Sequence, residues 1–230
     1  MRAGSPLWAL VRVTWRELLS RPFVGIICLV FCAVEISLGS SMHDLNDPTL
    51  ILTVILGAGS IGRDVSSGVL PLLFTRPIAR RTYVFAKWIA VSSAASVVGA
   101  AALAIQALLL WRQGAGLSAP AIGAAVFGGA TTAWGVASVL VFLSVLVAGV
   151  GDVGLWYGLH LVGILFARKA PARFNEEWRA LIQPSLAWDA LSGSHLLVWF
   201  RLVSYLSTVT FFLVLAVTAA NRKELSYASG

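Results

Sequence analysis

The stretch that decides the fold is residues 120–167, PAIGAAVFGGATTAWGVASVLVFLSVLVAGVGDVGLWYGLHLVGILFA, which contains one charged side chain, Asp152. As a single α-helix it would be about 72 Å long, at ~1.5 Å per residue, whereas the hydrocarbon core of a bilayer is ~30 Å thick. The Gly149-Val150-Gly151-Asp152 segment offers a natural turn. The stretch therefore predicts two membrane spans, about 120–148 and 153–167, with Asp152 capping the second.

The composition of the whole chain agrees with this reading. Of its 230 residues, 58% are hydrophobic and only 12% are charged, and its mean hydropathy is +0.85. A soluble domain of this size cannot bury so much apolar surface, because its surface is too large relative to its volume. The composition excludes a soluble enzyme, a disordered chain and a disulfide scaffold, and it predicts an integral membrane protein.

Further apolar stretches complete an all-α fold with six transmembrane helices. A transmembrane domain over 22–220 is expected to contain spans at about 23–38, 49–62, 88–110, 120–148, 153–167 and 196–220. Residues 1–21 predict an amphipathic helix in the membrane interface, because apolar residues recur there at spacings of three and four. Segment 63–87 is a basic loop, segment 168–195 is a polar loop on the opposite side, and 221–230 is a tail.

The basic residues predict the orientation. The net charge is +7, and the lysines and arginines cluster beside apolar runs, which favours an anionic membrane surface over nucleic acid as their partner. Of the 17 basic residues, 11 fall on the side of the termini and five on the other, with Arg201 inside the last span. The majority places both termini in the cytoplasm, although four basic residues at 168–179 oppose the rule locally.

One motif suggests a nucleotide site and is rejected. Gly57, Gly59 and Gly62 match the G-x-G-x-x-G fingerprint of dinucleotide-binding proteins. No acidic residue occurs between Asp64 and Asp152 to bind a ribose, no alternation of strands and helices follows, and membrane spans surround the motif. The glycines are more plausibly there to permit close helix packing.

The most informative segment is 63–87, RDVSSGVLPLLFTRPIARRTYVFAK. It places apolar side chains within a basic cytoplasmic loop, and such side chains need a cover of protein or lipid. One interpretation is an interfacial loop whose arginines bind lipid phosphates. The other is a docking helix for a cytosolic subunit.

The pattern of this loop resembles the first cytoplasmic loop of type-2 ATP-binding-cassette (ABC) permeases. The resemblance rests on Asp64, Gly68, Leu70, Leu73, Phe74, Pro77, Arg80, Tyr83 and Lys87. Segment 14–23, TWRELLSRPF, is similar to the family's N-terminal elbow helix, and the tail is similar to its basic-acidic ending. Span 5 lacks the long re-entrant helical hairpin of the lipid-linked polysaccharide exporters.

The resemblance implies a division of labour. The loop residues, excepting Tyr83, would form the docking site for an ABC ATPase subunit, with residues 64–75 as the coupling helix. The partner would bind ATP and magnesium, because the chain lacks a G-x-x-x-x-G-K-[ST] motif and the dipeptide Gly-Lys. A second permease subunit, identical or closely related, would complete the transport path in a bacterial inner membrane. We expect no catalytic group, metal site or cofactor in this chain.

Two charges within apolar spans stand apart from the loop. Glu35 and Arg201 both lie near the predicted outer ends of their spans, where each would either reach the interface or pair with the other.

Three functions remain open from the sequence. The leading prediction is the permease subunit of an ABC exporter. The alternatives are a non-transporting ABC membrane subunit that works on a periplasmic partner through 168–195, and an ATP-independent channel or scaffold.

Overall fold

The computed structural model describes residues 6–20, 46–68, 78–112, 118–147, 149–167, 172–186 and 195–227, together with the isolated Ile26, Val30 and Ala33. Within these residues all regular structure is helical, which confirms the predicted all-α class. The helices are α1 (Pro6–Leu19), α3 (Asn46–Gly57), α4 (Gly62–Ser66), α6 (Arg80–Arg112), α7 (Ala119–Leu146), α8 (Gly151–Ala167), α9 (Ala172–Ile182) and α10 (His195–Tyr227).

Four segments are long and apolar enough to cross a membrane. They are Thr49–Ser66, Arg80–Arg112, Ala119–Leu146 and Leu196–Arg222, and Gly151–Phe166 is a shorter apolar helix. The predicted first span at 23–38 lies outside the described residues, apart from three helical positions. The count of six spans therefore stays a prediction.

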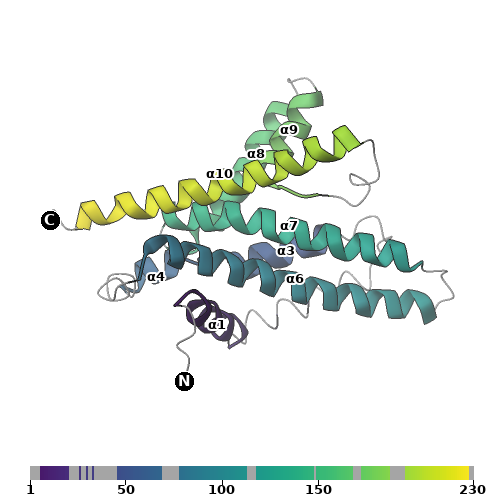
Figure 1. Cartoon of the computed structure of the whole chain (residues 1–230), viewed down its shortest axis with the longest axis horizontal. Helices are drawn as coiled ribbons and strands as arrows, with labels where there is room; N and C mark the ends of the chain where they lie inside the picture. The colour runs from purple at the N-terminus through teal and green to yellow at the C-terminus, as the bar shows by residue number, and fades with distance from the viewer. Residues whose placement is uncertain are drawn as a thin grey trace.

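Helices α3, α6 and α7 form the centre of the bundle, and α10 packs along α7 (Figure 1). Small residues allow this close packing. Thr49 of α3 is buried between α6 and α7, and a Cβ on Gly99 or Gly129 would come within 2.8 Å or 2.9 Å of its hydroxyl oxygen. The surrounding core is aliphatic, with Leu52, Val91 and Ala133 almost fully buried.

Helix α1 lies against the first turns of α6 (Figure 1). Its buried side is formed by Val11, Thr14 and Leu18, at the spacings of three and four expected of one helical face. Val11 packs on Ala86 and Ala90 of α6. The opposite side of α1 is exposed and carries Trp8, Arg12 and Arg16 among others.

Helix α9 folds back antiparallel along α8. The indole N–H of Trp178 donates to the carbonyl of Leu159 (3.0 Å), and that of Trp156 donates to the carbonyl of Ile182 (3.2 Å). The two helices therefore form a hairpin, which the sequence analysis did not expect, although the returning arm has only 11 residues. The polar composition of the segment hid this arrangement, although α9 carries Trp178 and the buried Ile182 toward its C-terminal end.

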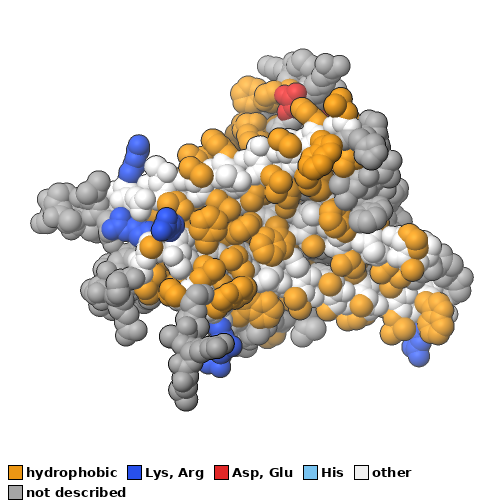
Figure 2. Space-filling view, viewed as in Figure 1, with side chains coloured by type: hydrophobic (Ala, Val, Ile, Leu, Met, Phe, Trp, Pro, Cys, Tyr) orange, Lys and Arg blue, Asp and Glu red, His pale blue; other side chains and the backbone are white. Residues whose placement is uncertain are grey.

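The surface shows where charge and apolar side chains gather. In Figure 2, hydrophobic side chains cover the middle of the bundle, and the visible lysines and arginines lie near the end that carries α4 and the last turns of α10, beside α1, and at the far end of α6. Charge at the ends and apolar cover between them is the pattern of a membrane-embedded bundle.

Candidate docking site at the base of the bundle

The predicted docking loop begins in α4 and ends in α6. Among its residues, Asp64, Gly68, Arg80, Tyr83 and Lys87 are described. The positions that carry the predicted apolar contact, Leu70, Leu73, Phe74 and Pro77, lie outside the described residues. What the structure defines is therefore the frame that holds this loop at both ends.

The frame centres on an ion pair between α4 and α6. The Lys87 ammonium lies 2.9 Å from Oδ2 of Asp64, and the Tyr83 hydroxyl donates a hydrogen bond to the same oxygen. Tyr83 and Lys87 are four residues apart on α6, so both side chains lie on one face of the helix. The side chain of Lys87 is only 7% exposed and that of Asp64 16%, so the pair is largely removed from solvent.

Helix α1 joins the same frame. Oε2 of Glu17 lies 3.7 Å from the Lys87 ammonium, and the Trp15 indole donates to the Ser93 hydroxyl of α6 (2.9 Å). Lys87 thus lies between two carboxylates, one from α1 and one from α4. The sequence analysis did not assign Glu17 to the site. In the sequence, Glu17 is an acidic residue in an amphipathic helix, and this pattern ordinarily indicates a position that faces solvent.

Arg80 connects the loop to the last helix. Its Nη1 donates to the backbone carbonyl of Asn221 in α10 (3.2 Å). Arg80 opens α6 directly after the loop, so the second arm of the docking segment is tied to α10. The first arm is tied through Asp64 to α6 and α1.

The helix before the docking loop is broken at the glycine motif. Helix α3 ends at Gly57 and α4 starts at Gly62, and Gly59 has a φ of +65°, a backbone conformation that residues with a Cβ adopt rarely. A Cβ on Gly62 would lie 2.5 Å from the carbonyl oxygen of Gly149. The glycines therefore serve close packing, as predicted, here against the turn between α7 and α8.

Two polar side chains satisfy the backbone at this break. The Ser144 hydroxyl of α7 accepts from the N–H groups of Ile61 (2.9 Å) and Gly62 (2.8 Å) and is hydrogen-bonded to the Asp152 carboxylate. Asp152 accepts from the N–H of Gly59 (2.8 Å) and from that of Val153 (2.9 Å). Asp152 is not the residue before α8, as an N-cap would be, but the second residue of that helix; its carboxylate accepts from a first-turn N–H and also holds α8 to the broken helix. These N–H groups are used internally and do not cradle a phosphate.

Polar contacts therefore join the helices at the end of the bundle where the docking loop begins and ends, which we call the base. The ion pair joins α1, α4 and α6, the hydrogen bonds of Ser144 and Asp152 join the helix break to α7 and α8, and Arg80 joins α6 to α10. A force applied to the loop would therefore reach six helices, α1, α4, α6, α7, α8 and α10, through polar contacts that are largely buried except at Glu17 and Arg80. Such an arrangement is suited to mechanical coupling.

Arg201, the predicted partner of Glu35, lies at the other end of the bundle. Glu35 falls outside the described residues, so the pairing stays a prediction. Arg201 is exposed on α10, close to the start of that helix. Among the residues that the structure describes, no group of three or more metal-ligating side chains comes together.

Comparison with known families decides the identity. A family model described as ABC-2 family transporter protein matches residues 18–167, well over half of the chain. The chain belongs to the ABC-2 transporter family. The match starts at the end of α1 and includes the docking loop, α8, and Ser144 and Asp152, which we call the clamp because they hold the helix break. No curated protein gives a significant match.

Membership in the ABC-2 family, together with the apolar helices, makes this chain a multi-pass, permease-type membrane subunit. Subunits of the ABC-2 family typically are not the catalytic component and normally work with an ATPase subunit. The resemblance found in the 63–87 loop is thereby confirmed at the level of the family.

Proposed function

We propose that this chain is the transmembrane permease subunit of an ABC exporter, which couples ATP hydrolysis by a partner ATPase to substrate movement across the membrane. The observation that carries the proposal is the buried Asp64–Lys87 ion pair, which fixes one arm of the docking loop to the first turns of α6. An interfacial loop that only binds lipid phosphates would not need its flanks, α4 and α6, tied to each other and to α1, α7, α8 and α10.

The docking surface itself is formed, in this proposal, by the apolar residues at 70–74 between the two tied arms. Insertion of apolar side chains into a groove of the ATPase would remove them from water, which gives the contact its affinity. Lys87 acts as a positioning residue, because its ammonium faces Asp64 and Glu17. Gly68, with a φ of +69°, supplies the sharp turn out of α4.

Movement of the ATPase would then displace the base of the bundle as a unit. The loop is bound to α6 and α1 by the ion pair and to α10 by Arg80, while the helix break holds α7 and α8. The contacts of Lys87, Ser144 and Asp152 are largely buried and have few alternative partners, so the helices that they join are expected to shift together rather than slide.

We further propose a bacterial inner membrane location with both termini in the cytoplasm, and assembly with a second permease subunit. The proposal is supported by Figure 1, in which α1, α4 and the last turns of α10 lie toward one end of the bundle. The excess of basic residues predicted on this side supports a cytoplasmic placement.

The proposal is tested by purifying the tagged chain in mild detergent from its own host and identifying the proteins that accompany it. We expect an ABC ATPase to co-purify and ATP hydrolysis to disappear when that subunit is removed. Hydrolysis by the chain alone, or purification without any ATPase, would contradict the proposal.

A further inference from the structure

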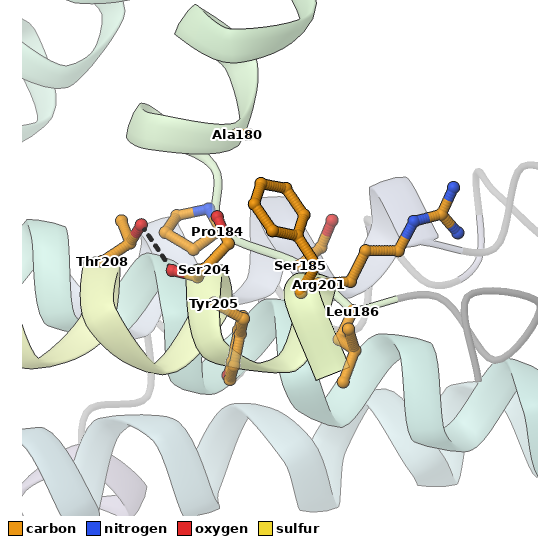
Figure 3. Close-up of a pocket in the computed structure, with 9 residues that line it drawn as sticks. Ala180, Pro184, Ser185, Leu186, Arg201, Ser204, Tyr205 and Thr208 are labelled. Atoms are coloured by element: carbon orange, nitrogen blue, oxygen red, sulfur yellow. Dashed lines mark hydrogen bonds between the residues drawn. The ribbon is translucent and has the colours of Figure 1, made fainter. Parts of the chain in front are cut away.

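A groove of about 300 Å³ lies between α10 and the segment that follows α9. It is lined by Ala180, Pro184, Ser185, Leu186, Phe200, Arg201, Ser204, Tyr205 and Thr208 (Figure 3). Ser204 and Thr208 lie one turn apart on α10, and the Arg201 side chain extends away from them, so that its guanidinium lies at one end of this row (Figure 3). The groove thus has a cation at one end and hydroxyl groups along a largely apolar helix.

The walls of the groove are held in place by hydrogen bonds to α7. The Thr131 hydroxyl donates to the carbonyl of Leu186 (2.9 Å) and accepts from its N–H (3.2 Å), and the Tyr205 hydroxyl donates to the carbonyl of Thr131 (2.8 Å). A Cβ on Gly135 would lie 2.0 Å from the carbonyl oxygen of Pro184, so the backbone at 184 sits directly on α7. The groove is therefore a formed feature of the fold.

The position of Arg201 along α10 sets its depth in the membrane. The 21 residues from Arg201 to Arg222 correspond to about 32 Å of helix, which matches the ~30 Å hydrocarbon core. Asn221 lies at the opposite boundary, because its carbonyl meets Arg80 at the start of α6. Arg201 is thereby placed at the depth of lipid phosphates in the other leaflet.

Among the described residues, no side chain supplies Arg201 with a compensating charge. Within the described residues it has no ion pair and no hydrogen bond, and its helical neighbours Trp199, Phe200 and Val203 are 63%, 73% and 56% exposed and apolar. A guanidinium is suited to two-pronged contact with a phosphate. The exposed apolar side chains beside it are suited to acyl chains.

We propose that this groove binds the phosphate-bearing headgroup of an anionic phospholipid. Arg201 contacts the phosphate, the Ser204 hydroxyl donates to the ester-linkage region one turn deeper, and the acyl chains extend below it past Val203. Thr208, one turn deeper again, donates to the carbonyl of Ser204 within the helix (3.0 Å) and is not part of the headgroup contact. The proposed function is used here only to assign the site to the outer leaflet, and lipid binding does not depend on it.

The test is native mass spectrometry of the detergent-solubilised protein titrated with palmitoyl-oleoyl-phosphatidylglycerol. Diacylglycerol with the same chains serves as the phosphate-free probe, and inorganic phosphate serves as the competitor. We expect retention of phosphatidylglycerol to fall about tenfold in Arg201→Ala, because the charge-assisted contact is lost. Arg112→Ala is the matched control, since Arg112 is also an exposed arginine at the same end of the bundle and does not line the groove.

Ser204→Leu, which fills the groove at an exposed position, is a second variant and is expected to reduce lipid retention while Arg201 is intact. Equal lipid retention by the Arg201→Ala and Arg112→Ala proteins would overturn the proposal. So would full displacement by inorganic phosphate at millimolar concentration, which would indicate a free-phosphate site. Lipid binding that appears only in Glu35→Gln would show that Arg201 is occupied by Glu35, and it too would overturn the proposal. Co-purification of the ATPase, measured on the same samples, reports separately on the proposed function.

Discussion

The Asp64 carboxylate and the Lys87 ammonium lie 2.9 Å apart, which joins the two arms that flank the docking loop. Tyr83 donates to the same carboxylate oxygen and Glu17 approaches the ammonium from α1, so the pair is the centre of a small network. A cation with a 7% exposed side chain is stable at this position only because carboxylates surround it. The pair therefore has a consequence for stability that can be measured.

Removing one partner of the pair should destabilise the base of the bundle. Lys87→Met or Asp64→Asn leaves a largely buried charge without its partner, at a cost of about 3 kcal/mol, and should lower the thermal unfolding midpoint by about 5–10 °C. The double variant should be less destabilised than the sum of the single variants, because neither charge remains. Differential scanning fluorimetry in detergent measures all three, with Arg81→Met as the exposed-cation control in the same helix. Additive effects in the double variant would show that the two residues do not interact.

This network also shows which part of the site the sequence could predict. The spacing of Asp64, Tyr83 and Lys87 pointed to one functional unit, and they do meet. Lys87 pairs with Asp64 in the structure, and pairing between distant helices is a tertiary property that spacing alone does not reveal; its predicted part in docking the ATPase stays a prediction. Hydropathy likewise predicted that the third span begins at 88, whereas α6 begins at Arg80. The charge of Lys87 excluded this turn from an apolar window, although Asp64 compensates it in the fold.

The C-terminal half of the chain also shows that apolar spans could be predicted from the sequence and that the packing of a polar segment could not. The apolar stretches at 120–148 and 196–220 coincide with α7 and α10, because continuous apolar runs in a membrane must be helical. The return of α9 along α8 could not be predicted, since it depends on Trp178 reaching the carbonyl of Leu159. Hydrogen bonds between a side chain and a distant backbone group leave no periodic signal in the sequence.

The Ser144 hydroxyl should be essential to the helix break. In Ser144→Ala the N–H groups of Ile61 and Gly62 lose their acceptor, and each unsatisfied donor costs about 1–3 kcal/mol. We expect a clearly lower unfolding midpoint and weaker stimulation of ATP hydrolysis by the permease. Ser138→Ala is the matched control, because Ser138 is buried in the same helix but bonds only to Gly135 of that helix. Equal effects of the two substitutions would argue against the clamp.

A methyl group at Gly62 should disrupt the docking of the broken helix on the α7–α8 turn. Its Cβ would lie 2.5 Å from the backbone oxygen of Gly149, which has no flexible side chain to move aside. Gly62→Ala should therefore reduce the yield of folded protein in size-exclusion chromatography. Gly123→Ala, in a helix with nothing within 4 Å of the new Cβ, should be neutral or slightly stabilising, by at most about 1 kcal/mol. A folded yield of Gly62→Ala equal to that of Gly123→Ala would contradict the packing described.

The orientation can be read from the accessibility of single cysteines. In a chain whose Cys28 and Cys32 are replaced by alanine, Asn175→Cys in α9 should react with a membrane-impermeant maleimide in intact cells. Ser67→Cys, exposed at the end of α4, should react only after permeabilisation. Labelling of residue 175 only in permeabilised cells would refute the six-span topology, and labelling of Ser67→Cys in intact cells would refute the cytoplasmic placement of the docking loop.

The most direct test of the central claim is the amount of ATPase that remains bound to the purified permease when Leu73 is replaced. Leu73→Glu places a charge in the predicted apolar contact, whereas Leu73→Met keeps its volume and apolar character. The account predicts that Leu73→Glu releases the ATPase while the unfolding midpoint of the permease is unchanged, and that Leu73→Met retains it. Undiminished ATPase binding by a folded Leu73→Glu protein would contradict the account.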